Sequence, residues 1–240
     1  MGYATFSDHQ VKALVDTINT QGFAVLPDWA TAEELSELRK MVALAVSNAG
    51  NSYVALNGSQ AVAGSRLHDW GTSPEFLQLC QRVVAQGTGE RPVELKLHQV
   101  LRCLIGDRGQ RESLIFHYDS FVLTAIMPVC MPEKTAPGDL VMLPNHRPIR
   151  RSYIRNLLDK LWVDNRWTQR RLVGRHARHA EGFTRVQMQP GHMYLFWGYR
   201  SLHANLPADP SLIRATAVFH YQNVHGDRPL VRRLRALLQH

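Results

Sequence analysis

The chain has 240 residues, a length that suits one globular domain with a substantial core. Hydrophobic residues make up 45% of it and charged residues 20%, which excludes a chain that is broadly disordered. The formal charge of +8 is local, because ten Lys or Arg and two acids fall within 145–180 and four more arginines fall within 228–240. The remaining 14 basic and 18 acidic residues leave about −4, which argues against a uniformly basic nucleic-acid-binding protein.

The cysteines and the N-terminal segment indicate the cellular compartment. The three cysteines, Cys80, Cys103 and Cys130, form no CxxC pair for zinc, and their odd number argues against a disulfide framework. The sequence shows no signal peptide and no apolar run of about 18 residues. We therefore expect a soluble, cytoplasmic protein with reduced thiols.

The first 91 residues are predicted to be mainly helical. Helices are expected to begin at Ser7 and Thr31, because each hydroxyl is followed three residues later by Gln or Glu in a capping-box pattern. A third helix is expected to begin at Ser73-Pro74 and to stop at Gly87. A short strand at 22–27 is predicted between the first two helices.

From residue 92 onward the sequence predicts a mainly β fold. Segments rich in β-branched, aromatic and aliphatic residues alternate with Gly/Pro turns at 93–105, 114–131, 139–143, 183–188, 193–197 and 213–222. Many short strands of this kind favour a sandwich or jelly roll. The basic stretch interrupts them with apolar residues at helical spacing, namely Ile154, Leu157, Leu158, Leu161 and Trp162. A final amphipathic helix is expected over 228–240.

Three short histidine–acid patterns are candidates for metal binding: His117/Asp119, His225/Asp227 and His179/Glu181. With twelve histidines in the chain, such a pattern is weak evidence by itself. The residues around each pattern must therefore decide among the three candidates. His117 and Asp119 fall in an apolar segment typical of a strand, where positions i and i+2 share a face. The second pattern lies in a turn and the third follows an arginine-rich helix, so we favour the first.

A 2-His-1-carboxylate site needs a second histidine from a neighbouring strand, and it leaves three open positions on Fe(II). His203 meets this need because it follows the predicted strand 193–197. Arg214 lies eleven residues later in an apolar strand, where an arginine is costly unless it meets an anion such as a dicarboxylate. The alternative is a pair of hydrogen-bonded core histidines with a buried acid. Seven further histidines are interpreted as surface or structural: His9, His68, His98, His146, His176, His192 and His220.

Five segments in this order carry a resemblance over almost the whole chain: Gly22–Pro27 with Glu33-Glu34-Leu35, Phe116–Asp119, Gly138–His146, Pro190–Asn205, and Arg214–Thr216. They resemble Fe(II)/2-oxoglutarate-dependent dioxygenases, most closely the phytanoyl-CoA dioxygenase-like branch. The resemblance implies a double-stranded β-helix (a jelly-roll, cupin-like core) with flanking helices. The expected organisation is one dioxygenase domain over 1–240, with a mainly helical flank (1–91), jelly-roll strands (92–144 and 182–223), a basic helical insert (145–181) and a C-terminal helix (228–240).

The resemblance also implies a set of site residues. Iron would be held by His117, Asp119 and His203, and 2-oxoglutarate would chelate that iron. The distal carboxylate of the cosubstrate would pair with Arg214, helped by Thr216 and Asn205. Arg102 occupies roughly the place where relatives keep another polar contact. No catalytic side chain is expected beyond the iron centre, and the retained carboxylate at Asp119 argues against a halogenase.

The implied activity is hydroxylation of an unactivated C–H bond of a small metabolite, with O2 as oxidant and decarboxylation of 2-oxoglutarate to succinate and CO2. Ascorbate is expected as the reductant in vitro. The alternatives are a non-catalytic jelly-roll binding module and a cupin-type metalloenzyme that does not use 2-oxoglutarate, and Arg214 argues against both.

The basic insert carries no family signature. The plain interpretation is a solvated helical face over the barrel mouth. The sharper hypothesis is a lid whose arginines attract an anionic substrate, such as a carboxylate, a phosphate, or an acyl carrier or CoA thioester. Nucleic acid is disfavoured, because repair dioxygenases of this superfamily carry a second arginine where this chain has His220. We expect no transmembrane segment, and peripheral membrane contact by the terminal helix is the weaker interpretation.

Overall fold

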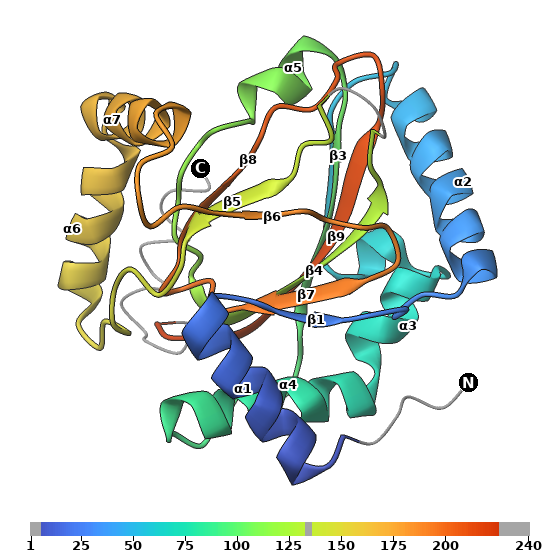
Figure 1. Ribbon diagram of the computed structural model, residues 1–240. Coiled ribbons are helices and arrows are strands. Elements are labelled where there is room, and N and C mark those ends of the chain that lie inside the picture. The colour runs from blue at the N-terminus through green and yellow to red at the C-terminus, as the bar shows by residue number, and fades with distance from the viewer. Residues whose placement is uncertain (1–5, 133–135, 226–240) are drawn as a thin grey trace.

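The computed structural model describes residues 6–132 and 136–225, in which two facing β-sheets carry helices on their outer sides (Figure 1). The helices of the N-terminal part are α1 (Asp8–Gln21), α2 (Ala32–Asn48), α3 (Arg66–Thr72) and α4 (Pro74–Thr88), with a short 3₁₀ turn η1 (Ser59–Val62). Both predicted capping boxes are confirmed. The Ser7 and Thr31 hydroxyls each accept the backbone N–H three residues later at 3.2 Å, and the side chains of Gln10 and Glu34 bond back to the cap backbone.

The predicted helix end at Gly87 is wrong. α4 continues to Thr88 and ends at Gly89, whose φ of 70° is the left-handed conformation that glycine favours. Gly87 lies inside the helix and faces the Trp197 ring, where a Cβ would lie 2.3 Å from a ring carbon. Its lack of a side chain serves packing and does not end the helix.

The larger sheet has six antiparallel strands in the order β1-β7-β4-β9-β3-β2. They are β1 (Ala24–Leu26), β7 (Met193–Phe196), β4 (Phe121–Cys130), β9 (Arg214–Asn223), β3 (His98–Leu104) and β2 (Val54–Asn57). Sequence analysis did not predict β2, which lies within the flank of 1–91 and adds a strand to the edge of the sheet. It pairs with β3 so that Ala55 lies opposite Arg102.

The smaller sheet has the order β6-β5-β8, with β6 (Thr184–Val186), β5 (Leu140–Leu143) and β8 (Leu202–Asn205). β8 was not predicted as a strand. His117 pairs with His203 through two backbone hydrogen bonds of 2.9 and 3.1 Å, so the segment before Asp119 runs along the free edge of β8. The predicted jelly-roll architecture is confirmed, although the described strands do not close into a barrel.

Three apolar clusters correspond to three layers of packing. The largest joins the N-terminal helices to the outer face of the six-stranded sheet, the second lies between the two sheets, and the third lies between the smaller sheet and the insert. In Figure 1, α1 to α4 cover one side of the larger sheet and α6 and α7 lie beyond the smaller one. The interior between the sheets is therefore enclosed on two sides.

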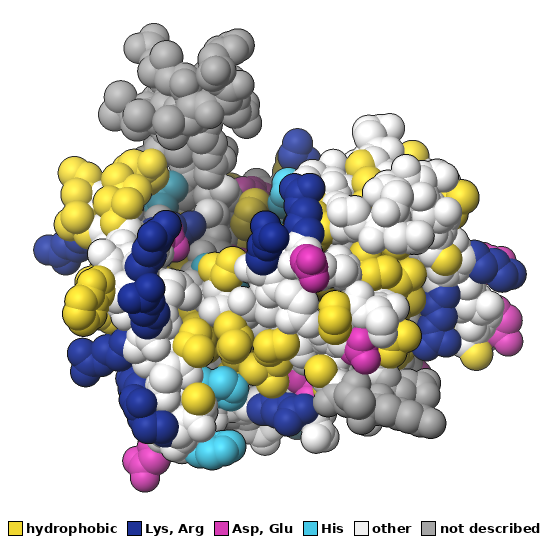
Figure 2. Space-filling model, turned by 90° about the horizontal axis from the view of Figure 1, so that it is seen from above, with side chains coloured by type: hydrophobic (Ala, Val, Ile, Leu, Met, Phe, Trp, Pro, Cys, Tyr) yellow, Lys and Arg dark blue, Asp and Glu magenta, His cyan; other side chains and the backbone are white. Residues whose placement is uncertain are grey.

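The insert forms two helices, α6 (Tyr153–Asp164) and α7 (Arg166–Ala177), and a further helix α5 (Gly106–Arg111) follows β3. α5 was not predicted, and it falls within the range 92–144 assigned to strands. Lys and Arg side chains form a row on the left of Figure 2, where α6 and α7 lie. The predicted helix over 228–240 lies outside the described residues, and the domain limits stay predictions. No helix in the described part of the chain is long and apolar enough to cross a membrane.

Candidate metal and cosubstrate site

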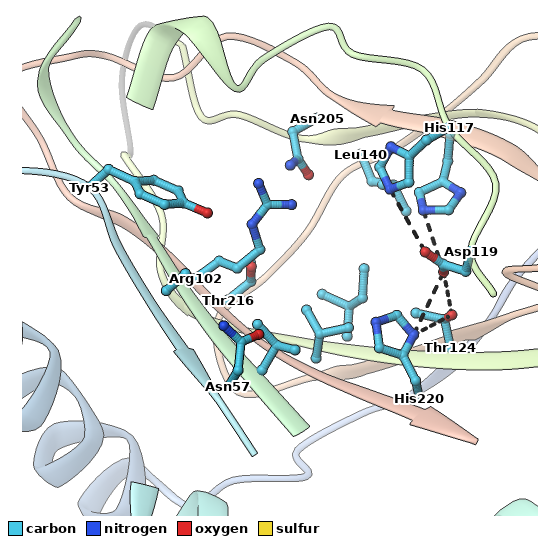
Figure 3. Close-up of a pocket in the computed structure, with 15 residues that line it drawn as sticks. Tyr53, Asn57, Arg102, His117, Asp119, Thr124, Leu140, Asn205, Thr216 and His220 are labelled. Atoms are coloured by element: carbon cyan, nitrogen blue, oxygen red, sulfur yellow. Dashed lines mark hydrogen bonds and ion pairs between the residues drawn. The ribbon is translucent and has the colours of Figure 1, made fainter. Parts of the chain in front are cut away.

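A cavity of about 330 Å³ lies between the two sheets (Figure 3). Its floor consists of residues that share the inner face of neighbouring strands, because side chains alternate between faces along each strand. On β3 and β9, Val100 lies opposite Val218 and Arg102 lies opposite Thr216. His203 and Asn205, two residues apart on β8, supply part of the opposite wall.

The candidate metal ligands lie together at one end of this cavity. The candidate ligand atoms of His117, Asp119 and His203 all lie within 4.8 Å of one another. The Asp119 carboxylate oxygens lie 3.8 Å from His117 Nε2 and 3.6 Å from His203 Nε2. No other group of this kind, with three or more His, Cys, Asp or Glu, is found in residues 6–132 and 136–225. The rival pair His179/Glu181 is exposed, and Asp227 of the other rival pair lies outside the described residues.

Backbone carbonyls fix the tautomer of both histidines. His117 Nδ1 lies 3.0 Å from the Ile115 carbonyl oxygen, and His203 Nδ1 lies 2.9 Å from the Ser201 carbonyl oxygen. Because a carbonyl oxygen only accepts, each Nδ1 carries a proton, which leaves Nε2 as the nitrogen that can bind a metal ion. Burial, followed by the repulsion of His203, lowers the pKa of His117 to about 4, so this ring is neutral at physiological pH. Both rings are thus ready to bind a metal ion.

One hydrogen bond holds the Asp119 carboxylate directly, and two others fix its surroundings. The Thr124 hydroxyl donates to Asp119 Oδ2 at 2.5 Å, and the Asp119 backbone N–H donates to the Gly198 carbonyl oxygen at 3.0 Å. His220 Nδ1 lies 3.1 Å from the Thr124 hydroxyl, whose single proton is already donated, so His220 donates to that oxygen. Burial alone would raise the pKa of Asp119, but the three neighbouring histidines and the Thr124 hydroxyl lower it well below its usual range. The carboxylate is ionised and oriented.

Sequence analysis missed this support. His220 was interpreted as surface or structural, whereas its ring lines the cavity and lies 3.8 Å from Asp119 Oδ2. Thr124 was not singled out at all. The signal was available only in part: His220 and Thr124 are partners in the β4–β9 register, which the sequence does not reveal.

The opposite end of the cavity is cationic. Arg102, Thr216 and Asn205, three of the four predicted cosubstrate residues, line the cavity together with Tyr53. In Figure 3 the Arg102 guanidinium lies between Tyr53 and Asn205 and extends into the cavity, at the end opposite His117, Asp119 and His203. One of its nitrogens lies 3.1 Å from Glu112, which leaves other N–H donors of the guanidinium for a ligand.

Arg214, the fourth predicted residue, lies behind this end and does not itself line the cavity. Its fully buried guanidinium donates to the Gly138 carbonyl oxygen at 2.7 Å and to Asn205 Oδ1 at 2.8 Å. In the described part of the chain no carboxylate forms an ion pair with it. Burial, followed by the repulsion of Arg102, lowers the pKa of Arg214 to about 9. Two neighbouring arginines without a shared acid form a site that an anion would stabilise.

The insert contributes structure near the site but no residue of the cavity lining. Arg147 is buried, with its guanidinium carbon 3.8 Å from the centre of the Tyr118 ring and 4.5 Å from that of Tyr199. Gln169 of α7 accepts from the Phe116 N–H and donates to the Phe116 carbonyl oxygen, at 3.0 and 2.7 Å. The insert therefore braces the segment that carries His117.

No protein-family model and no curated protein matches the sequence. Solved structures do match. A prolyl-4-hydroxylase from Pseudomonas putida is 14% identical, with a TM-score of 0.53 over 89% of this chain and 98% of that one. EctD from S. alaskensis, solved with 2-oxoglutarate and 5-hydroxyectoine, is 16% identical, with a TM-score of 0.55 over 92% of this chain and 78% of that one.

The epimerase SnoN, solved with Fe3+, alpha-ketoglutarate and nogalamycin RO, is 12% identical, with a TM-score of 0.54 over 93% of this chain and 91% of that one. At these identities the likeness shows the fold, a double-stranded β-helix shared with oxygenases that depend on iron and 2-oxoglutarate. The finer resemblance to the phytanoyl-CoA dioxygenase-like branch stays a prediction.

Proposed function

We propose that the protein is an Fe(II)/2-oxoglutarate-dependent oxygenase that acts on a small molecule. The observation that carries the proposal is the two-ended cavity, in which the His117–Asp119–His203 group lies at one end and Arg102 with Thr216 and Asn205 at the other. Two histidines and one carboxylate are the donor set that suits non-haem Fe(II) with open positions. A dicarboxylate with a 2-oxo acid end matches both ends of such a cavity.

The residues present fit both groups. The donors are the Nε2 atoms of two histidines and an ionised carboxylate, and the buried Arg214 forms no ion pair with an acid in the described part of the chain. The bound metal and cosubstrate would supply the oxidising power, with C–H substrate, O2 and 2-oxoglutarate giving alcohol, succinate and CO2. The protein supplies position, charge and exclusion of water.

The residues that line the cavity would bind different parts of 2-oxoglutarate. Arg102 would bind the distal carboxylate through charge-assisted hydrogen bonds, and Arg214 would add positive charge behind it. Thr216 and Asn205 would add neutral hydrogen bonds. The apolar side chains between the two ends would contact the hydrocarbon part of the cosubstrate and exclude water from it, namely Val100, Ile126, Leu140 and Val218.

Hydroxylation of an unactivated C–H bond is the outcome we propose first, on a substrate that is anionic or of acyl type. The local positive charge of the insert supports an anionic substrate, although Arg147 and Arg150 are already paired with Asp159 at 3.0 and 2.8 Å. The remaining basic residues of the insert are the ones that could attract it. A cytoplasmic location remains part of the proposal.

Anaerobic calorimetry tests the proposal. We expect 2-oxoglutarate to bind only after a divalent metal has been added, and succinate to form under air with Fe(II) and ascorbate. Metal binding without 2-oxoglutarate binding would favour a cupin-type metalloenzyme. Binding of neither would favour a non-catalytic module.

A further inference from the structure

Helix α6 packs against the protein through its polar side. Asn156 and Val163 are buried, and Asp159 accepts hydrogen bonds from Arg147 and Arg150. Lys160 Nζ donates to the Ser120 hydroxyl at 2.8 Å. These positions follow the i, i+3, i+4, i+7 pattern of one helix face, so the face that contacts the body of the protein is mostly polar.

The opposite face of α6 is apolar and exposed. Its side chains follow the same spacing and are 68%, 42%, 59%, 58% and 60% exposed at Ile154, Leu157, Leu158, Leu161 and Trp162. Trp167, at the start of α7, is 84% exposed. The stripe extends over about 12 Å of helix. A contiguous apolar surface of this kind marks a site of interaction with a partner or a membrane.

The apolar stripe has basic surroundings. Arg155 on α6 and Arg166, Arg170 and Arg171 on α7 are exposed, and no ion pair joins any of them to an acid in the described part of the chain. Figure 2 shows the row of Lys and Arg side chains beside hydrophobic ones on this side of the molecule. Residues 150–178 carry nine Lys or Arg and two acids, so the complementary partner is anionic.

We propose that α6 and the start of α7 form a docking face for the surface of an anionic phospholipid bilayer. A helix with Leu and Trp on one face and Arg beside it is the pattern of an interfacial helix, whose apolar face enters the boundary between headgroups and acyl chains. A second copy of this chain is the poorer occupant, because it would bring two strongly basic segments together. The sequence predicted an amphipathic helix here, but the direction of its apolar face is known only from the structure.

The polar face of α6, opposite the docking face, contacts the segment that carries the candidate metal site. Ser120, the partner of Lys160, directly follows Asp119. A space of about 160 Å³ between α6 and the strand ends is lined by Ser120, Leu157, Lys160 and Asn223, among others. Binding to a bilayer would therefore bring the metal end of the cavity near the membrane surface.

Flotation of the full-length protein with vesicles tests the docking face without metal or 2-oxoglutarate, so its outcome is independent of the proposed function. We expect binding to vesicles of phosphatidylcholine with phosphatidylglycerol, weaker binding at high salt, and none to phosphatidylcholine alone. Leu158→Glu with Leu161→Glu should weaken the partition by about tenfold or more for each leucine. Each of Arg170→Gln and Arg171→Gln should weaken it by about fivefold.

Leu44→Glu is the matched control. Leu44 is 62% exposed on α2, which lies on the other side of the molecule in Figure 1. We expect it to bind the anionic vesicles as the unaltered chain does. The proposal is overturned if the unaltered chain does not float with anionic vesicles, or if the double leucine variant floats as well as the control. A dimer in sedimentation that the double leucine variant abolishes, without vesicle binding, would overturn it in favour of self-association.

Discussion

Gly198→Ala is expected to damage the metal site while preserving the fold. An ideal Cβ at Gly198 would lie 2.2 Å from the Thr124 hydroxyl oxygen and 2.3 Å from Asp119 Oδ2. Both atoms would have to move by about 1 Å or more to reach van der Waals separation. Gly198 does not have a positive φ, so an alanine is compatible with its backbone and the effect arises from the contact alone.

The expected loss of metal affinity follows from how little a ligand can be displaced in a metal site. Ligand distances in a metal site hold to within about 0.2 Å, so a carboxylate displaced by about 1 Å no longer fits the ion. Changes in the groups that orient a ligand cost about 10–100-fold in metal affinity. Overpacking should also lower the free energy of unfolding by about 1–3 kcal/mol, which leaves the protein folded.

Competition with a chelator for Co(II) or anaerobic Fe(II) measures the affinity, and circular dichroism checks the fold. Gly174→Ala is the matched control, because Gly174 lies in α7 and a Cβ there would be 3.4 Å from a flexible Arg178 nitrogen. It should leave the metal affinity unchanged and increase stability by up to about 1 kcal/mol. A folded Gly198→Ala protein that binds metal as tightly as the unaltered chain would refute the reasoning.

Three further predictions concern the same cavity. Thr124→Val removes the hydroxyl between Asp119 and His220, so metal affinity measured with the same chelator should fall about tenfold, and Thr124→Ser should restore it. Arg102→Gln should weaken 2-oxoglutarate binding by about 10–100-fold in anaerobic calorimetry and leave metal binding unchanged; an unaltered 2-oxoglutarate affinity would contradict the assigned role. In the presence of metal, 2-oxoglutarate at about 100 times its Kd should raise the melting temperature by roughly 5–10 °C, because it binds the folded protein and not the unfolded chain; the absence of a shift in calorimetry would contradict this.

Much of the fold could be predicted from local patterns. The capping boxes at Ser7 and Thr31 involve bonds within four residues, so the local sequence is enough to predict where those helices begin. Gly87 was misread because its partner, Trp197, lies far away in the chain. Short strands such as β2 and β8 were missed for a related reason, since they exist through pairing with distant partners and not through a long apolar run.

The candidate site likewise contains residues that local sequence predicts and residues that only the tertiary structure brings together. His117 and Asp119 were grouped from the sequence on the expectation of one strand. The strand β4 begins only at Phe121, but His117 pairs with His203 in an isolated bridge, and all three side chains meet. His220 and Thr124 could not be added, because their contact depends on the register between β4 and β9. Arg102 was given the weaker role and Arg214 the stronger one, yet Arg102 faces the cavity and Arg214 lies behind Asn205. Whether a side chain lines the cavity or lies behind its wall depends on the tertiary structure, so the sequence alone did not distinguish Arg102 from Arg214.

The measurement that tests the central claim most directly is the visible absorption of the anaerobic protein as Fe(II) and then 2-oxoglutarate are added. Chelation of the iron by the 2-oxo acid should produce a weak charge-transfer band. We expect that band to be absent in His117→Ala and in Asp119→Ala, and to require more 2-oxoglutarate in Arg102→Gln. Succinate should then form when air is admitted. A protein that binds Fe(II) but shows neither the band nor succinate would contradict the assignment as a 2-oxoglutarate-dependent oxygenase.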